Sequence, residues 1–98
     1  LAARVLGSYP VLDDPALQYY VNQVGKALAL NSSRPELEFR FGILDSTSVN
    51  AYATPGGYVL VTKGAIDQMQ DEAELAGVLA HEIAHTTERH IVKELGIK

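Results

Sequence analysis

The sequence predicts an α+β fold in which helices pack against a small sheet of about three strands. Two observations lead to this prediction. Apolar residues recur at spacings of three and four in two segments, one before and one after the middle of the chain, which is typical of amphipathic helices. The segment between them alternates apolar and polar residues and then contains a Pro-Gly-Gly turn, which is typical of strands joined by a hairpin.

The composition is that of a globular domain. The chain holds 98 residues, enough for one compact unit with a modest core. Apolar residues make up 47% and charged residues 20%, which excludes a disordered chain. The formal charge is −4 and the basic residues are scattered, so nucleic acid is not expected as a partner. No apolar run approaches the ~20 residues of a membrane span. The lack of cysteine excludes thiolate metal ligands and leaves the compartment open.

The first third predicts an extended stretch at residues 9–12 and then a helix. Asp13 and Asp14 precede Pro15, which combines an N-cap with proline at the first helical position. Apolar residues recur for about four turns until the polar segment 31–35 ends the pattern. We expect this helix to pack against the core without contributing chemistry. Its apolar positions are Leu17, Tyr20, Val21, Val24 and Leu28.

The middle of the chain predicts three strands. Residues 37–44 alternate with period two, so we expect a strand with one buried face. A hairpin should follow, in which residues 49–54 and 58–62 pair on either side of a turn at 55–57. The apolar positions of the first strand are Leu37, Phe39, Phe41 and Ile43.

Two further helices are predicted after the hairpin. A short one covers residues 65–70. Asp71 can then cap a longer helix, and Glu74, three positions later, completes a capping-box pattern. This last helix is expected over residues 72–94.

The last helix contains the pattern HExxH at residues 81–85. Residues four apart lie about 40° apart around a helix and ~6 Å apart along it, so the imidazoles of His81 and His85 can converge on one metal ion. Histidine pairs of this kind are typical of zinc. Glu82 is turned by about 100°, beside the metal, where it can take the proton of the attacking water. The pattern predicts zinc-dependent hydrolysis of a peptide bond.

Other interpretations of this segment fit less well. A pair of ordinary surface histidines is the simplest alternative. A di-iron site would need a second Glu-x-x-His unit, and a metzincin would need Gly at position 88 and His at 91, where this chain has Glu88 and Ile91. His90 lies on the opposite side of the helix from His81, so we do not expect it to bind the same ion. Glu88 shares the histidine face but extends too far along a straight helix to join them.

Several segments together resemble a known family. They are residues 50–59 (NAYATPGGYV), 62–64 (TKG), 71–76 (DEAELA) and 81–85 (HEIAH). The chain, from about residue 6 to residue 90, resembles the zinc metallopeptidases that include HtpX, the CAAX prenyl endopeptidase and the periplasmic BepA-like proteases. It is most similar to the exported bacterial branch.

The resemblance implies a zincin-like fold, of the gluzincin type, with the HEIAH helix beneath the sheet. It implies zinc bound by His81, His85 and a glutamate from a later helix, which we expect beyond residue 98. It also implies that residues 50–53 form the sheet edge on which an extended polypeptide substrate pairs. These substrate-binding candidates are Asn50, Ala51, Tyr52 and Ala53. Unfolded or misassembled proteins of the bacterial periplasm or cell envelope are the implied substrates, and a non-catalytic scaffold domain is the alternative function.

We interpret residues 1–98 as the N-terminal part of a metallopeptidase catalytic domain, cut before its third zinc ligand. The missing helices should leave Leu79, Ile83 and Ile91 exposed, so self-association is expected.

Overall fold

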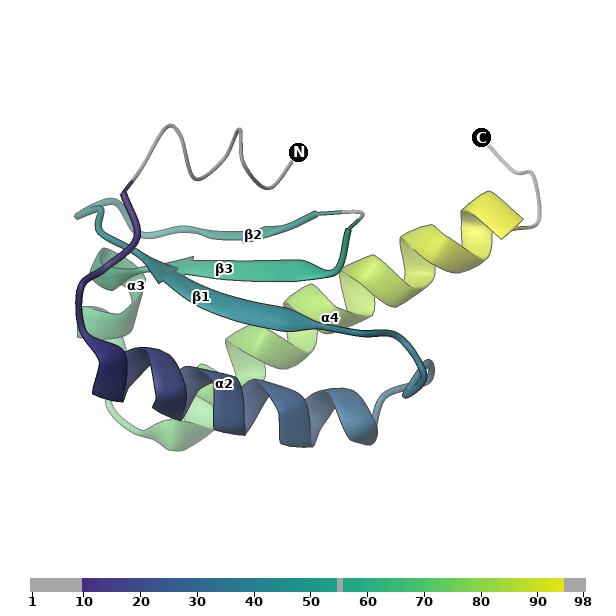
Figure 1. Cartoon of the computed structure of the whole chain (residues 1–98), viewed down its shortest axis with the longest axis horizontal. Coiled ribbons are helices and arrows are strands. Elements are labelled where there is room, and N and C mark those ends of the chain that lie inside the picture. The colour runs from purple at the N-terminus through teal and green to yellow at the C-terminus, as the bar shows by residue number, and fades with distance from the viewer. Residues whose placement is uncertain (1–9, 55, 95–98) are drawn as a thin grey trace.

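The computed structural model describes residues 10–54 and 56–94, with side chains as far as Thr87 in the last helix. Helices and a small sheet are both present, so the predicted α+β class is confirmed (Figure 1). None of the helices in the described part of the chain has the length and hydropathy needed to cross a bilayer. The elements, in order, are α2 (Pro15–Leu30), β1 (Arg40–Leu44), β2 (Ala51–Ala53), β3 (Tyr58–Thr62), α3 (Lys63–Gln68) and α4 (Glu72–Glu94).

The sheet has the strand order β1-β3-β2, so β3 lies in the centre. β1 runs parallel to β3, with Phe41 opposite Val59, and β2 runs antiparallel to β3, with Tyr52 opposite Leu60. The predicted hairpin is therefore confirmed as β2 and β3. Its turn is closed by the Thr54 amide, which donates to the Tyr58 carbonyl at 2.9 Å.

Glycine is required at one position of this turn. Gly57 has a φ of +88°, a region that L side chains rarely adopt. A Cβ there would lie 2.5 Å from the Glu38 carbonyl oxygen, and the Gly57 carbonyl accepts a hydrogen bond from the Arg40 amide at 2.9 Å. The turn is thus packed against the start of β1. Pro55, also predicted in the turn, lies outside the described residues, as does Tyr9 of the predicted extended stretch.

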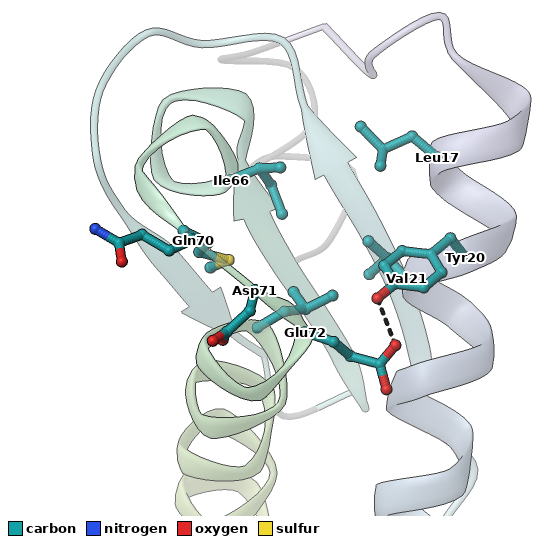
Figure 2. Close-up of a pocket in the computed structure, with 9 residues that line it drawn as sticks. Leu17, Tyr20, Val21, Ile66, Gln70, Asp71 and Glu72 are labelled. Carbon is teal, nitrogen blue, oxygen red and sulfur yellow. Dashed lines mark hydrogen bonds between the residues drawn. The ribbon is translucent and has the colours of Figure 1, made fainter.

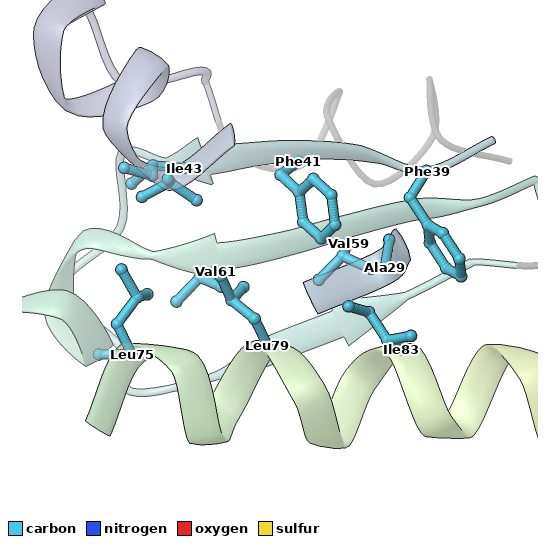
Figure 3. Packing of buried hydrophobic residues seen from close by; sticks show 11 residues of the cluster. Ala29, Phe39, Phe41, Ile43, Val59, Val61, Leu75, Leu79 and Ile83 are labelled. Carbon is cyan, nitrogen blue, oxygen red and sulfur yellow. The ribbon is translucent and has the colours of Figure 1, made fainter. Parts of the chain in front are cut away.

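One face of the sheet packs against both long helices (Figure 3). Leu75, Leu79 and Ile83 point from α4 toward Val61 and its neighbours in the sheet, as Figure 3 shows. The prediction that Leu79 and Ile83 are exposed is therefore wrong: their exposed fractions are 0% and 3%. The sheet and α2 already cover this side of α4. The side chain of Ile91 lies outside the described part of the chain.

The helix α2 begins and packs as its sequence predicts, except at Tyr20. The Asp14 side chain accepts a hydrogen bond from the Leu17 amide at 3.1 Å, which confirms the N-cap. Val21, Gly25 and Ala29 form the most buried stripe, and a Cβ at Gly25 would lie 2.6 Å from the Phe41 ring. Glycine is needed there because the helix and β1 approach so closely.

Tyr20 does not join the core, although the helical spacing placed it among the apolar positions. Its side chain is exposed, and its hydroxyl donates to a carboxylate oxygen of Glu72 at 2.6 Å (Figure 2). This hydrogen bond raises the pKa of the Tyr20 hydroxyl. It joins α2 to the first turn of α4, beside a groove of about 270 Å³ with a partly apolar lining.

The first strand is shorter than predicted and is buried on both faces at its end. Pairing begins at Arg40, while Leu37 lies in a turn. Phe41 and Ile43 are buried as the alternation predicts, but Leu44 is buried as well. Leu44 forms a bridge with Val11, which confirms the extended segment before α2.

Side chains of α2 cover the outer edge of β1. The Gln18 carboxamide accepts from the Ile43 amide at 2.9 Å and donates to the Ile43 carbonyl at 3.1 Å. Asn22, one turn later, makes the same pair of bonds with Phe41 at 3.3 and 2.8 Å. The Leu12 amide also donates to the Ile43 carbonyl. Each carboxamide thus replaces the backbone of a neighbouring strand, so this edge is already paired.

Candidate active site

The helix α4 carries His81 and His85 on the side opposite its packing stripe. Its start is fixed by Asp71, whose side chain accepts a hydrogen bond from the Glu74 amide at 3.0 Å, one half of the predicted capping box. Leu79, two residues before the motif, and Ile83, inside it, are buried against the sheet. The rotation of the helix is therefore set by its core contacts, and His81 and His85 face outward.

His81 and His85 lie side by side. Their ring centroids are 4.6 Å apart and the ring planes are inclined by 52°. Both side chains are exposed, so a metal ion can reach them from solvent. Glu82 is half-buried on the neighbouring face of the helix. The structure thus brings the two predicted ligands together and places the predicted base beside them.

The donor set of this site fits zinc in part. Two imidazoles with one turn between them are a normal pair of zinc ligands. Within residues 10–54 and 56–87, however, no group of three His, Cys, Asp or Glu side chains is close enough to hold a metal ion. The side chains of Glu88 and His90, both set aside on helical geometry, lie outside the described part of the chain. A third ligand is needed for a closed site.

Two threonines follow the motif and bond back into the helix. The Thr86 hydroxyl donates to the Glu82 carbonyl at 3.2 Å, and the Thr87 hydroxyl donates to the Ala84 carbonyl at 3.0 Å. Both side chains are buried, so these bonds satisfy their hydroxyls without another partner. This stretch of α4 can therefore lie against the protein although its side chains are polar.

Three of the predicted substrate residues, Ala51, Tyr52 and Ala53, form β2, and Asn50 comes directly before it. The outer edge of β2 is not paired by any described segment. The Asn50 carbonyl accepts from the Thr62 amide, and the Thr54 amide donates to the Tyr58 carbonyl. Backbone direction alternates along a strand, so residues 50, 52 and 54 face β3 while Ala51 and Ala53 face outward. α4 packs beneath β2 and β3. The outward groups of β2 therefore lie at an edge that no described segment pairs, above the helix that carries the motif.

The side chain of Asn50 occupies part of this edge. Its carboxamide oxygen accepts from the Ala51 amide at 2.9 Å, and its nitrogen donates to the Tyr52 hydroxyl at 3.2 Å. Among the described residues, nothing occupies the Ala51 carbonyl or the two backbone groups of Ala53, so these are the groups that an incoming chain could use. The four residues are thus brought together on one edge, and their role in substrate binding stays a prediction.

Sequence reasoning missed Thr62, a buried residue that bonds to the segment before β2. The sequence does contain a signal for this residue, because threonine is a common helix N-cap and Thr62 directly precedes a helical segment. Its side chain does accept from the Ala65 amide at 3.2 Å, and α3 begins at Lys63 instead of Ala65.

Small residues on the outer side of α4 leave room for another chain to approach the helix. Ala80 and Ala84 are exposed and line a second groove, of about 270 Å³, between α4 and the end of α2. A Cβ at Gly77 would meet no atom of the described chain within 4 Å. The described strands pack on the other side of the helix, against Leu75, Leu79 and Ile83.

Comparison with known proteins agrees with the motif. The chain is 34% identical over 92 residues to the beta-barrel assembly-enhancing protease of Escherichia coli (strain K12), an alignment that covers 94% of this chain and 19% of that protein. It is 36% identical over 92 residues to the protein of the same name from Yersinia pestis, with the same coverage of 94% and 19%.

A eukaryotic relative is similar over a shorter stretch. The mitochondrial metalloendopeptidase OMA1 of Schizosaccharomyces pombe is 34% identical over 76 residues, which are 78% of this chain and 23% of that protein. The chain thus spans about a fifth of the length of these curated relatives. The model of peptidase family M48 matches residues 15–98, well over half of the chain. The chain belongs to peptidase family M48.

Proposed function

We propose that the protein is a zinc-dependent metalloendopeptidase that hydrolyses peptide bonds of polypeptide substrates. The observation that carries the proposal is the exposed pair of His81 and His85, with ring centroids 4.6 Å apart, in a chain of family M48. Two relatives are named as a protease and a metalloendopeptidase, which supports the same activity. We propose a glutamate from a later segment as the third ligand, because the described residues supply no third donor.

Three residues of this chain would have direct roles in catalysis. His81 and His85 would hold the zinc through one imidazole nitrogen each. When bound, the metal supplies Lewis acidity toward the scissile carbonyl and toward the attacking water. Glu82 would accept the proton of that water and pass it to the leaving amine. Its half-buried position, turned away from the histidine face, fits a base better than a ligand.

The substrate would bind as an added strand along the outer edge of β2. Extended peptides join exposed sheet edges through backbone hydrogen bonds, and these bonds do not depend on side-chain identity. Ala51 and Ala53 offer such bonds, whereas the outer edge of β1 is occupied by Gln18 and Asn22. Binding through backbone groups requires an unfolded segment, so we propose unfolded or misassembled proteins as the substrate class.

We propose the bacterial periplasm or cell envelope as the location. Two relatives are named for beta-barrel assembly, and barrels of this kind belong to outer membranes. Self-association, predicted from exposed apolar positions on α4, loses its basis at Leu79 and Ile83, which are buried.

Two variants of the full-length protein test the enzyme against the alternative of a non-catalytic scaffold. Glu82→Gln should keep zinc and lose cleavage, because an amide cannot accept the proton. His81→Ala should lose both. Zinc content is measured by atomic emission, and cleavage is measured with an unfolded, fluorescently labelled casein. Loss of zinc from Glu82→Gln would contradict its role as the base. A metal-free wild-type protein that still binds polypeptides would support the scaffold.

A further inference from the structure

The connection between β1 and β2 lies mostly at the surface and is held through one buried side chain. Asp45, Thr47, Ser48 and Val49 are exposed. The C-terminal end of β3, the start of α3 and this connection meet at the same end of the sheet (Figure 1). Thr62, the last residue of β3, lies between them with an exposed fraction of 0%. The position of the first residues of β2 therefore depends on what Thr62 contacts.

The Thr62 hydroxyl uses every hydrogen-bonding position that it has. It donates to the Ser48 carbonyl at 2.5 Å, with the Asn50 carbonyl at 3.1 Å as a second acceptor. It accepts from the Asn50 amide at 3.1 Å and from the Ala65 amide at 3.2 Å. A hydroxyl has one donor and two acceptor sites, so this one is fully satisfied. It connects the loop before β2 to the first turn of α3.

A second contact holds the same loop. The Gly64 amide donates to the Ser46 carbonyl at 2.9 Å. A Cβ at Gly64 would lie 2.2 Å from the Thr47 carbonyl oxygen and 2.4 Å from that of Ser48. Any side chain at this position would therefore displace the loop backbone.

We propose that Thr62 is a positioning residue for the peptide-binding edge. Through its hydroxyl, and with the close approach at Gly64, it fixes residues 46–50 and hence the direction in which Ala51 and Ala53 present their backbone groups. This inference rests on the proposed role of β2 as the substrate edge. The Thr62 side chain bonds to the loop before β2 and to the first turn of α3, so it would not touch the substrate.

The test compares Thr62→Val, which keeps the shape and removes the hydroxyl, with Thr62→Ser, which keeps the hydroxyl. Both are made in the zinc-loaded full-length protein that also carries Glu82→Gln, so that bound peptide is not cleaved. Two quantities are measured: the Kd of a fluorescent unfolded peptide and the hydrogen exchange of the amides in residues 46–53. Zinc content and circular dichroism serve as controls for the metal site and the fold.

For Thr62→Val we expect about a tenfold weaker Kd and about a tenfold faster exchange in residues 46–53, since buried donors lose their acceptor. Exchange in α4 and zinc content should stay at the parent values. Thr62→Ser should stay within about twofold of the parent in both measurements. An unchanged Kd for Thr62→Val would overturn the proposal, even with faster exchange. Equal losses in both variants would also overturn it, since the hydroxyl would not be the cause.

Gly64→Ala keeps the test valid if Thr62→Val does not fold. It displaces the loop without removing the hydroxyl, so it should weaken peptide binding and accelerate exchange in residues 46–53 as well. A Kd and an exchange rate equal to those of the parent would contradict the proposed role of this contact. Failure of the proposed function has a different signature: a zinc-loaded protein with wild-type Glu82 that cleaves no polypeptide, whatever the behaviour of the Thr62 variants.

Discussion

The direction of the backbone groups on β2 can be tested with one proline. Ala53→Pro removes an amide that faces outward, toward the proposed substrate. It leaves every hydrogen bond to β3 in place. By the same alternation, the amide of Tyr52 faces Leu60, so Tyr52→Pro removes a bond inside the sheet. The two substitutions are neighbours in sequence and should have opposite consequences. Ala53→Pro should reduce cleavage, and Tyr52→Pro should reduce stability.

The magnitudes follow from one hydrogen bond each. A single net hydrogen bond is worth ~0.5–1.5 kcal/mol, so kcat/KM of Ala53→Pro should fall about twofold to tenfold. Its stability should change by less than ~1 kcal/mol, because the ladder with β3 stays complete. Tyr52→Pro leaves the Leu60 carbonyl without its donor inside the sheet and should cost ~1–3 kcal/mol.

The assay measures turnover of unfolded casein and urea denaturation of the same preparations of full-length protein. Ala53→Ser serves as the matched control, since it changes the side chain at the same position and keeps the amide; it should retain wild-type turnover. A folded Ala53→Pro protein with unchanged kcat/KM would place the substrate elsewhere. A loss of stability equal to that of Tyr52→Pro would show that the alternation has been assigned to the wrong residues.

Two further predictions concern residues of α4: one the stability at Gly77, the other zinc binding by the histidine pair. Gly77→Ala should raise the free energy of unfolding by ~0.5–1 kcal/mol, measured by urea titration. The added methyl group meets no described atom, and the substitution removes a glycine from a helix interior. A lower stability would show that the space around position 77 is occupied. The 98-residue chain alone should bind zinc at least about 100-fold more weakly than the full-length protein and show no peptidase activity, because two imidazoles do not close a zinc site. Tight one-to-one binding by a dilute monomer in titration calorimetry would reveal a third ligand within these residues.

Features with local causes were predictable from the sequence. The cap at Asp14, the cap at Asp71 and the long helix that carries the motif depend on residues within one or two turns of each other. The side-by-side arrangement of His81 and His85 follows from helical spacing alone. The structure adds that both side chains are exposed and gives the separation of their rings.

Features with distant causes were not predictable. Leu44 is buried although the alternation places it on the outer face, and Val11, more than thirty positions earlier, forms a bridge with it. Ile83 was expected to be exposed because helices beyond residue 98 were expected to cover it, whereas the sheet and α2 cover it instead. The loop bonds of Thr62 also join residues that are twelve or more positions apart, as with Asn50 and Ser48. A single sequence without structure does not reveal such contacts.

The two edges of the sheet differ in a way that relates the fold to the proposed activity. An unpaired strand edge binds any extended chain, so proteins usually cover it. Here Gln18 and Asn22 cover β1 with side-chain amides, which cannot be displaced without unpacking α2. On β2, the described residues place only the Asn50 carboxamide against one of the outward amides. A substrate that adds a strand therefore has one edge available among the described residues, and that edge lies above the helix of His81 and His85.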